Sequence, residues 1–247
     1  MAVDKMQILK KALQIREELG IEESSPIDIF ALVQNIPHLS LVLYPLGKNI
    51  SGMCIRIGKD TVIAVNSGMS VGRQNFTIAH ELYHFYFDET GKTVICNNKV
   101  IGGGNTIEQN ADQFASYFLI PLGKEIVFKD ASEITFEKII ESEQYYKVSN
   151  QAMLYRLVDE NIISQSQADL YKKNVIKTAE SLGFDISLYC ASDENKLYKT
   201  YGYYIKQSQQ LKEKEMIADS KYEQLLIEAF RSDIVFGDEN EVQELDD

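Results

Sequence analysis

Two histidines and a glutamate near residue 80 have a spacing that suits metal chemistry. The run FTIAHELYH from 76 to 84 contains His80, Glu81 and His84 in the pattern HExxH. Residues four apart lie on one face of an α-helix, so both imidazoles can reach a single ion. Zn²⁺ binds imidazole nitrogen readily, and a catalytic zinc site keeps one position for water beside three protein ligands. Glu81 is then placed to act as general base on that water.

The surrounding sequence favours a helix over a chance occurrence. The pattern alone should arise by chance in about one of a hundred chains of this length. Here, however, it holds two of the chain's 3 histidines. Apolar residues recur around it at helical spacings of three and four, at Phe76, Ala79, Tyr83 and Phe87. Metal binding is therefore favoured over the alternative, in which the histidines only pack or form hydrogen bonds.

The third ligand must come from outside the motif. In one subclass, glycine and histidine follow the second histidine by three and six residues, but this chain has Phe87 and Thr90 there. The other common arrangement takes a glutamate from a later helix, giving a His₂Glu site. Glu108 fits, because it lies in the first turn of a helix predicted to start at Thr106 and to end before Pro121.

The composition of this second helix supports its place beside the first. Thr106 and Gln109 predict a capping box at its start. The small residues Ala111 and Ala115 would let the two helices approach closely. Asp112, one turn after Glu108, could accept the free ring N–H of a ligating histidine and thereby set its tautomer.

These segments resemble a known family. The runs RQNFTIAHELYH (73–84) and EQNADQFASYFLIP (108–121), with the β-rich run TVIAVN (61–66) before them, are similar to the ImmA/IrrE metallo-endopeptidases. The resemblance covers roughly the first half of the chain. It implies a compact zincin domain, Zn²⁺ held by three ligands, and a glutamate as general base; the matching residues are His80, His84, Glu108 and Glu81. It also implies substrates: helix-turn-helix repressors, cleaved to derepress mobile-element or stress genes.

Composition indicates an intracellular globular protein. The chain has 247 residues, of which 45% are hydrophobic, enough for one substantial core and a smaller appended one. Residues 1–19 alternate charged and apolar positions without a secretory apolar core, and no run is long enough to span a membrane. Cys54, Cys96 and Cys190 are odd in number and far apart, which is typical of reduced thiols that pack in a cytoplasmic protein, although a zinc role for one of them stays open.

The net charge of -12 bears on binding partners. So acidic a surface repels phosphate, which disfavours direct binding to nucleic acid. It would attract a basic DNA-binding protein, which is compatible with a repressor substrate, although the same charge serves solubility. Part of it lies in an acidic tail, residues 238–247, which we expect to be disordered.

The hydrophobic pattern predicts an α+β fold. A small three-stranded sheet (39–44, 52–57 and 61–66) should pack on the HExxH and Glu-ligand helices as a zincin-like metallopeptidase core, and residues 92–104 should form a loop. We divide the chain into this core at 1–130, a helical C-terminal region at 131–237, and the tail. That region should contain a helix-turn-helix-like pair (136–145 and 149–158) and a helical hairpin (198–216 and 220–234).

The strand before the metal helix is a candidate for substrate binding. In zincins such a strand lies at the lip of the cleft, where a peptide can add by main-chain pairing. We therefore expect four residues to align the substrate: Ile63, Ala64, Val65 and Asn66. The alternative is an interior strand that does not contact substrate.

The sequence leaves some of the chemistry open. A second donor should help to stabilise the oxyanion, and Arg73 and Tyr83 are the candidates. Two other functions also fit the same site. One is a non-cleaving zinc-containing regulator that binds a repressor or toxin partner, and the other is a metal-dependent hydrolase of small-molecule amides.

Overall fold

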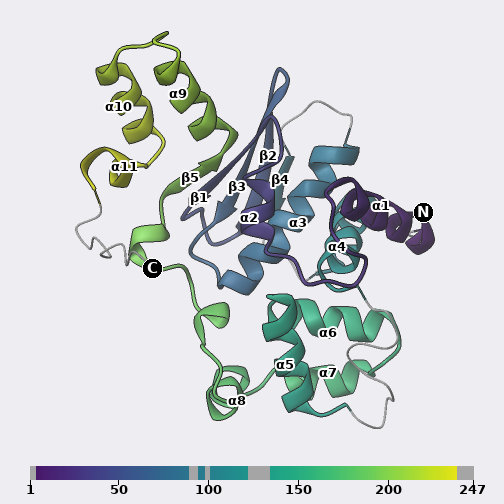
Figure 1. Cartoon of the computed structure of the whole chain (residues 1–247). Coiled ribbons are helices and arrows are strands. Elements are labelled where there is room, and N and C mark those ends of the chain that lie inside the picture. Colours follow the sequence, from purple (N-terminus) through teal and green to yellow (C-terminus); the bar gives the residue numbers. More distant parts are fainter. Residues whose placement is uncertain (1–3, 89–93, 98–100, 122–133, 238–247) are drawn as a thin grey trace.

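A five-stranded sheet forms the centre of the fold. The computed structural model describes residues 4–88, 94–97, 101–121 and 134–237 (Figure 1). The strand order is β4-β2-β3-β1-β5. The strands are β1 (Leu39–Tyr44), β2 (Ile50–Ile57), β3 (Asp60–Asn66), β4 (Val94–Asn97) and β5 (Lys199–Gly202).

Helices surround this sheet, so the fold is α+β, as predicted. They are α1 (Lys5–Glu18), α2 (Ile29–Val33), α3 (Val71–Phe87), α4 (Thr106–Leu119), α5 (Phe136–Tyr146), α6 (Asn150–Asp159), α7 (Gln165–Tyr171), α8 (Val175–Ser181), α9 (Tyr203–Glu213), α10 (Asp219–Glu228) and α11 (Ser232–Phe236). Within the described residues, no helix is both long and apolar enough to cross a membrane. The predicted tail at 238–247 lies outside these residues, and the division of the chain at residue 130 stays a prediction.

The sheet contains the three predicted strands and two more. β2 and β3 form an antiparallel hairpin whose turn contains Gly58 at φ 62°, and β1 runs parallel to β3. β4 lies within residues 92–104, which we expected to be a loop, and pairs antiparallel with β2. Four residues between polar and glycine-rich neighbours give too short a pattern to be detected in the sequence. β4 and β5 form the two edges of the sheet.

The second correction concerns the C-terminal hairpin, which was predicted to begin at Tyr198. In the structure Lys199–Gly202 pairs antiparallel with β1, and α9 begins only at Tyr203. Gly202 makes the change of direction possible, because its φ of 83° is unfavourable for residues with a side chain. The chain thus returns to the sheet only after helices α4 to α8.

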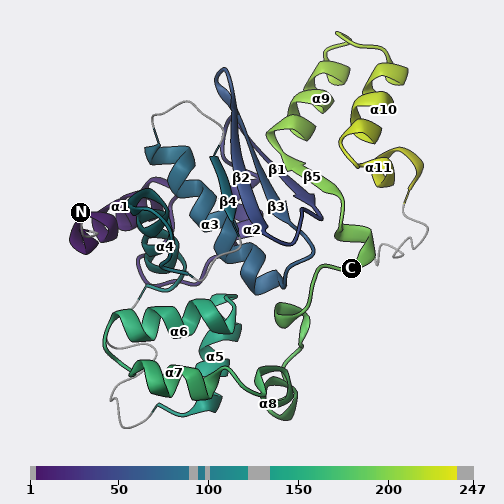
Figure 2. The same ribbon diagram turned by 180° about the vertical axis from the view of Figure 1, so that it is seen from behind.

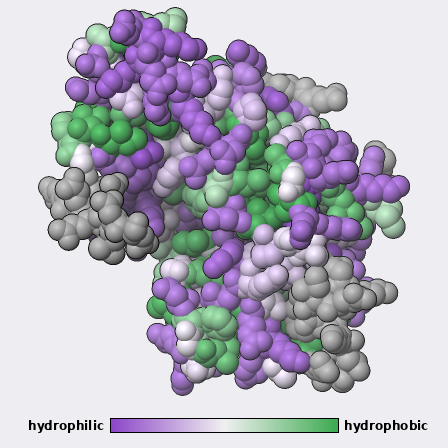
Figure 3. All heavy atoms as spheres, in the orientation of Figure 1, coloured by the Kyte–Doolittle hydropathy of each residue, from purple (hydrophilic) through white to green (hydrophobic). Residues whose placement is uncertain are grey.

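Helices α9 and α10 lie side by side beyond the β5 edge (Figures 1 and 2). An aromatic cluster attaches them to the sheet, because the rings of Tyr44, Tyr198 and Phe230 lie 5.2 to 5.9 Å apart. Figure 3 shows mainly hydrophilic side chains over α9 and α10 and a hydrophobic patch at the level of α11. The tyrosines of this region therefore contribute first to packing within the chain.

Helix α3 is buried along most of its length. It packs against β2 and β3 on one side and against α4 on the other (Figures 1 and 2). Its polar residues are consequently buried too, and each needs an internal partner. Asn75 donates to the carbonyl of Lys147 at 2.7 Å, and Gln74 donates to the carbonyl of Met69 at 2.7 Å. These bonds hold the start of α3 against neighbouring chain segments.

A glycine sets the contact between α3 and the α5–α6 pair. A Cβ atom on Gly72 would lie 2.7 Å from the nitrogen of Ser149 and 2.8 Å from the carbonyl carbon of Val148. Both are backbone atoms, which cannot rotate away as a flexible side chain can. Only glycine therefore permits the close approach between the first turn of α3 and the turn that joins α5 to α6.

We expect Gly72→Ala to destabilise the protein. Overpacking of this kind typically costs about 1–3 kcal/mol, and in a chain of this size each kcal/mol lowers Tm by about 2–4 °C. Thermal unfolding followed by circular dichroism would measure the change. Gly47→Ala is the matched control, because a Cβ there meets no atom within 4 Å. Equal Tm values for the two variants would contradict the close approach.

Candidate metal centre

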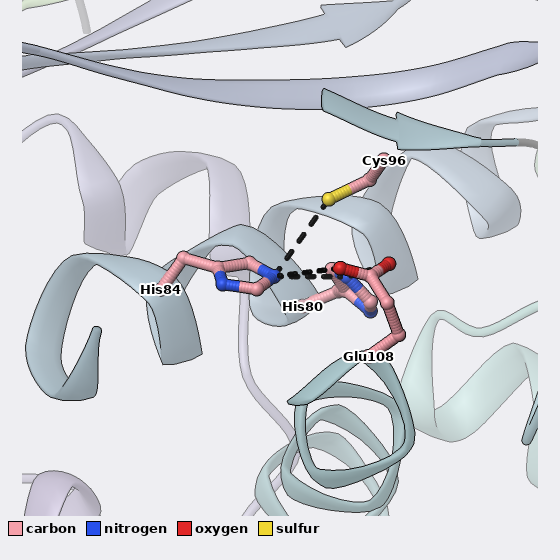
Figure 4. Close-up of side chains that lie close together, drawn as sticks. All are labelled: His80, His84, Cys96 and Glu108. Atoms are coloured by element: carbon pink, nitrogen blue, oxygen red, sulfur yellow. Dashed lines mark hydrogen bonds and ion pairs between the residues drawn. The ribbon is translucent and has the colours of Figure 1, made fainter. Parts of the chain in front are cut away.

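Three elements bring four potential ligands together (Figure 4). His80 and His84 come from α3, Glu108 from the first turn of α4, and Cys96 from the edge strand β4. Each residue offers one ligand atom, and these atoms all lie within 4.8 Å of one another. The predicted trio is thus brought together, and a cysteine joins it.

The separations suit tetrahedral coordination. The two Nε2 atoms of His80 and His84 are 3.4 Å apart. The Glu108 carboxylate oxygens lie 3.6 Å from the first and 3.7 Å from the second, and Cys96 Sγ lies 3.7 Å from His84 Nε2. Tetrahedral bonds of about 2.0 Å to nitrogen or oxygen and about 2.3 Å to sulfur separate neighbouring ligand atoms by about 3.3–3.6 Å. These four separations lie close to that range, so the four residues could hold one metal ion.

The hydrogen bonding of His80 also calls for a cation. His80 Nδ1 lies 2.8 Å from Asp112 Oδ1. An ionised carboxylate only accepts, so Nδ1 carries the hydrogen, and in the neutral ring Nε2 presents a lone pair. That lone pair faces the Glu108 carboxylate and the other imidazole, an arrangement that repels unless a proton or a metal ion lies between them. Asp112 thus occupies the place that the sequence suggested for it.

Asp112 also organises the chain before α4. Its second oxygen, Oδ2, accepts the backbone N–H of Gly102 at 2.7 Å. The helix itself begins at a different cap from the predicted capping box: the side chain of Asn105 accepts the N–H groups of Ile107 and Glu108. The cap orients the first turn of α4, in which Glu108 lies with its side chain 21% exposed. Glu108 is thus the most solvent-accessible of the three predicted ligands.

The second histidine is fixed from the sheet side of the helix. His84 Nδ1 lies 3.5 Å from Asp88 Oδ2, one turn further along the chain. Arg56 of β2 donates to the backbone carbonyls of His84, Phe85 and Asp88 at 2.7 to 2.9 Å. A guanidinium that binds the last carbonyls of a helix also interacts favourably with its dipole. Arg56 therefore anchors the end of α3 on which His84 sits.

The two histidines have opposite shifts in their pKa values. Burial opposes the charge of His80, but hydrogen bonds with Asp112, Cys96 and Glu108 outweigh it and raise its pKa well above the ordinary value. Burial, followed by repulsion from His80, lowers the pKa of His84 to about 4. Without a metal, a single proton held mainly by His80 would therefore stabilise the cluster. A metal ion at the same point would replace that proton.

Glu81 is buried beneath the sheet. Its side chain is fully buried, neither carboxylate oxygen has a hydrogen-bond partner among the residues that the structure describes, and burial raises its pKa to about 7. Gly52 of β2 provides the space, since a Cβ there would lie 2.9 Å from Glu81 Oε1 and 2.6 Å from Thr77 Cγ2. An unpartnered buried carboxylate costs free energy, and groups with such perturbed pKa values cluster at functional sites.

The four residues predicted to align the substrate lie in the interior of the sheet. β3 is an interior strand, paired with β1 through residues 61–66 and with β2 through residues 60–65. Ile63, Ala64, Val65 and Asn66 are all buried. The prediction that they align a peptide by main-chain pairing is wrong, because both sides of the strand are already occupied. The edge next to the cluster is β4.

The two candidate oxyanion donors, Tyr83 and Arg73, make most of their contacts outside the cluster. Tyr83 is buried and packs its ring 5.7 Å from that of Phe114 and 5.4 Å from that of Phe87. Arg73 donates to Gln151 at 3.3 Å and lines a separate cavity of about 410 Å³. Tyr83 also lies edge-on to His84, with ring centroids 5.9 Å apart. The choice of oxyanion donor between the two stays a prediction.

Sequence reasoning left a zinc role for Cys96 open without placing it at the cluster, and it missed Asp88, Arg56 and Gly52. Asp88 lies four residues after His84, so helical spacing could have found it. The other three lie on β2 and β4, and their proximity to the cluster arises from strand pairing, which opposes Cys96 to Gly52. No local pattern encodes that pairing across about 40 residues.

A pair of histidines with a carboxylate from the next helix, on an α+β fold, is an arrangement typical of metallopeptidase centres. Residues 45–158 match the family model of peptidase M78, described as the IrrE N-terminal-like domain. This match supports membership of the ImmA/IrrE family of metallopeptidases, as the resemblance implied. All the cluster residues lie within the matched segment, which also includes α5 and most of α6. A comparison with curated proteins gives no match.

We expect Asp112→Asn to weaken metal binding by about 10- to 100-fold, the usual effect of removing a carboxylate behind a ligating histidine. Chelator competition with Zn²⁺ would measure the affinity. Asp60→Asn is the matched control, because Asp60 makes the same 2.8 Å contact with His38 Nδ1 away from the cluster. Equal losses in both variants would show that Asp112 acts on the fold rather than on the metal.

Proposed function

We propose that this protein is a zinc-dependent endopeptidase that cleaves a helix-turn-helix repressor or a similar regulatory protein and so derepresses mobile-element or stress genes. The observation that carries the proposal is the cluster of His80, His84 and Glu108 with the unpartnered Glu81 beside it. A peptidase family supports a protein substrate. The identity of the metal as zinc rests on its preference for these donors.

The roles of the side chains follow from their positions. A bound zinc ion would polarise the scissile carbonyl and lower the pKa of water. Glu81, with a pKa of about 7, is matched to accept a proton from the attacking water and to give it to the leaving amine. Asp112 accepts the Nδ1 hydrogen of His80 and so keeps its Nε2 lone pair directed at the centre, whereas Asp88 makes a looser ion-pair contact of 3.5 Å with His84 Nδ1.

The edge strand β4 is the candidate platform for the substrate. It pairs with β2 on one side, and within the described residues no strand pairs with its other side. An extended peptide can add to such an edge through main-chain hydrogen bonds. Because Cys96 of this strand lies in the cluster, a peptide paired here would pass close to the centre. Residues Val94–Asn97 thus replace the interior strand in the proposal.

The charge of the chain supports a basic partner. A net charge of -12 attracts DNA-binding proteins and repels DNA itself. A repressor substrate would therefore meet the enzyme more readily when it is not bound to its operator.

Cys96 supports a second candidate function. A thiolate beside three other ligands would complete a closed tetrahedron, which is typical of structural rather than catalytic zinc. This favours the alternative of a non-cleaving zinc-containing regulator that binds a repressor or toxin partner. Cleavage by the wild-type protein distinguishes the two.

We expect Gly52→Ala to reduce turnover while zinc affinity is retained. The added methyl group would displace the Glu81 carboxylate, whereas His80, His84 and Glu108 keep their places. Cleavage rate and zinc affinity should be measured on the same preparation, with Gly47→Ala as the control. A parallel loss of both quantities would mean that the substitution disturbs the whole centre.

The central test combines two variants with one substrate. The zinc-loaded protein should be incubated with the helix-turn-helix repressor encoded beside its gene, and the products read by mass spectrometry. We expect a defined internal cut by the wild type, none by Glu81→Gln, which keeps its zinc, and none by His84→Ala, which loses zinc. Cleavage by Glu81→Gln at the wild-type rate would refute the role of Glu81. An intact repressor that binds both wild type and Glu81→Gln would favour the regulator.

A further inference from the structure

Cys96 is directed into the metal centre by the alternation of its strand. Its neighbour Ile95 is 54% exposed, whereas Cys96 is 2% exposed and points to the opposite face, towards α3 (Figure 4). Its sulfur completes the four-atom cluster at 3.7 Å from His84 Nε2. The cysteine is therefore a fourth potential ligand, supplied by a different element from the other three.

The residue opposite explains why the sulfur fits. Strand pairing places Cys96 across from Gly52, whose missing side chain leaves room on the same face. Gly52 is also the residue that accommodates the Glu81 carboxylate. The Glu81 carboxylate and the Cys96 sulfur thus share one space beneath β2, where an attacking water would also have to bind.

We propose that Cys96 is a fourth, displaceable metal ligand that occupies the water position and keeps the enzyme latent. The inference concerns the regulation of the proposed endopeptidase centre and rests on it. Cys96 would bind as a thiolate, with its proton released to solvent. When the metal–sulfur bond breaks, the thiolate takes up a proton and water can enter the position beside Glu81. Sulfur and water exclude each other, so turnover requires the sulfur to leave.

The position of Cys96 makes displacement feasible. β4 has only four residues, lies at the sheet edge, and pairs with β2 through a register that shifts between Ile50 and Gly52. The three predicted ligands, in contrast, lie on the long helices α3 and α4, which pack against each other. A short edge strand yields more easily than two packed helices. The cysteine is thus the ligand whose loss would leave the other three in place.

Cobalt substitution of the full-length protein tests the ligand directly. Tetrahedral Co²⁺ absorbs in the visible range, and a thiolate ligand adds a sulfur-to-cobalt charge-transfer band in the near ultraviolet. We expect this band in the wild type and its loss in Cys96→Ala, which should still bind one cobalt ion. Cys54→Ala is the matched control, because Cys54 is also 2% exposed and lies on the adjacent strand outside the cluster. It should keep the band.

Azide binding tests whether the sulfur fills the open position. Azide occupies a free coordination site and shifts the visible cobalt spectrum. It should do so at much lower concentration in Cys96→Ala than in the wild type or Cys54→Ala. Equal azide sensitivity in the three proteins, or bound cobalt without the charge-transfer band in the wild type, would overturn the proposal.

Repressor cleavage separates this inference from the proposed function. Zinc-loaded Cys96→Ala should cleave several-fold faster than the wild type, and an equal rate would overturn latency. If no variant cleaves while the sulfur band and the azide difference are both present, the ligand assignment stands and the endopeptidase assignment fails. If His84→Ala binds cobalt as the wild type does, the metal centre itself is refuted.

Discussion

Removal of ionisable groups from water is the constraint on which this structure depends. Helix α3 carries His80, Glu81 and His84 into the space between the sheet and α4, where all three are at most 7% exposed. A buried charge or lone pair without a partner is costly. Asp112 and Asp88 each face one ring nitrogen, and the remaining donors converge on a single point that a cation would stabilise. The protein core thus holds the donor atoms in place, and a bound metal would offset part of the free-energy cost of burying them.

The edge of the sheet controls what this centre can do. β4 brings a sulfur to the cluster and also offers the main-chain edge to which a peptide can add. The same short strand would therefore take part in both substrate binding and latency. Such a combination suits a peptidase directed at regulatory proteins, whose uncontrolled activity would be harmful. The opposing Gly52 matters for the same reason, since it makes room for the base and the sulfur together.

The C-terminal half contacts the elements around the centre at several places. The α5–α6 turn packs against the first turn of α3 at Gly72, and β5 extends the sheet beside β1. Both contacts link helices that follow the metal-binding segment to the elements that hold it. The helical region is consequently more than an appended unit.

The sequence by itself determined the helix of His80 and His84, the helix of Glu108 and Asp112, and the three strands β1 to β3. Each of these elements shows a hydrophobic periodicity or a short motif within its own residues. It did not reveal β4 and β5, whose four-residue runs become strands only when a partner strand satisfies their backbone groups. For the same reason it placed the substrate at β3, which proved to be interior. The positions of Cys96, Arg56 and Gly52 at the centre follow from tertiary structure alone. Their roles depend on which strand lies beside which, and strand pairing is a long-range contact that no local spacing encodes.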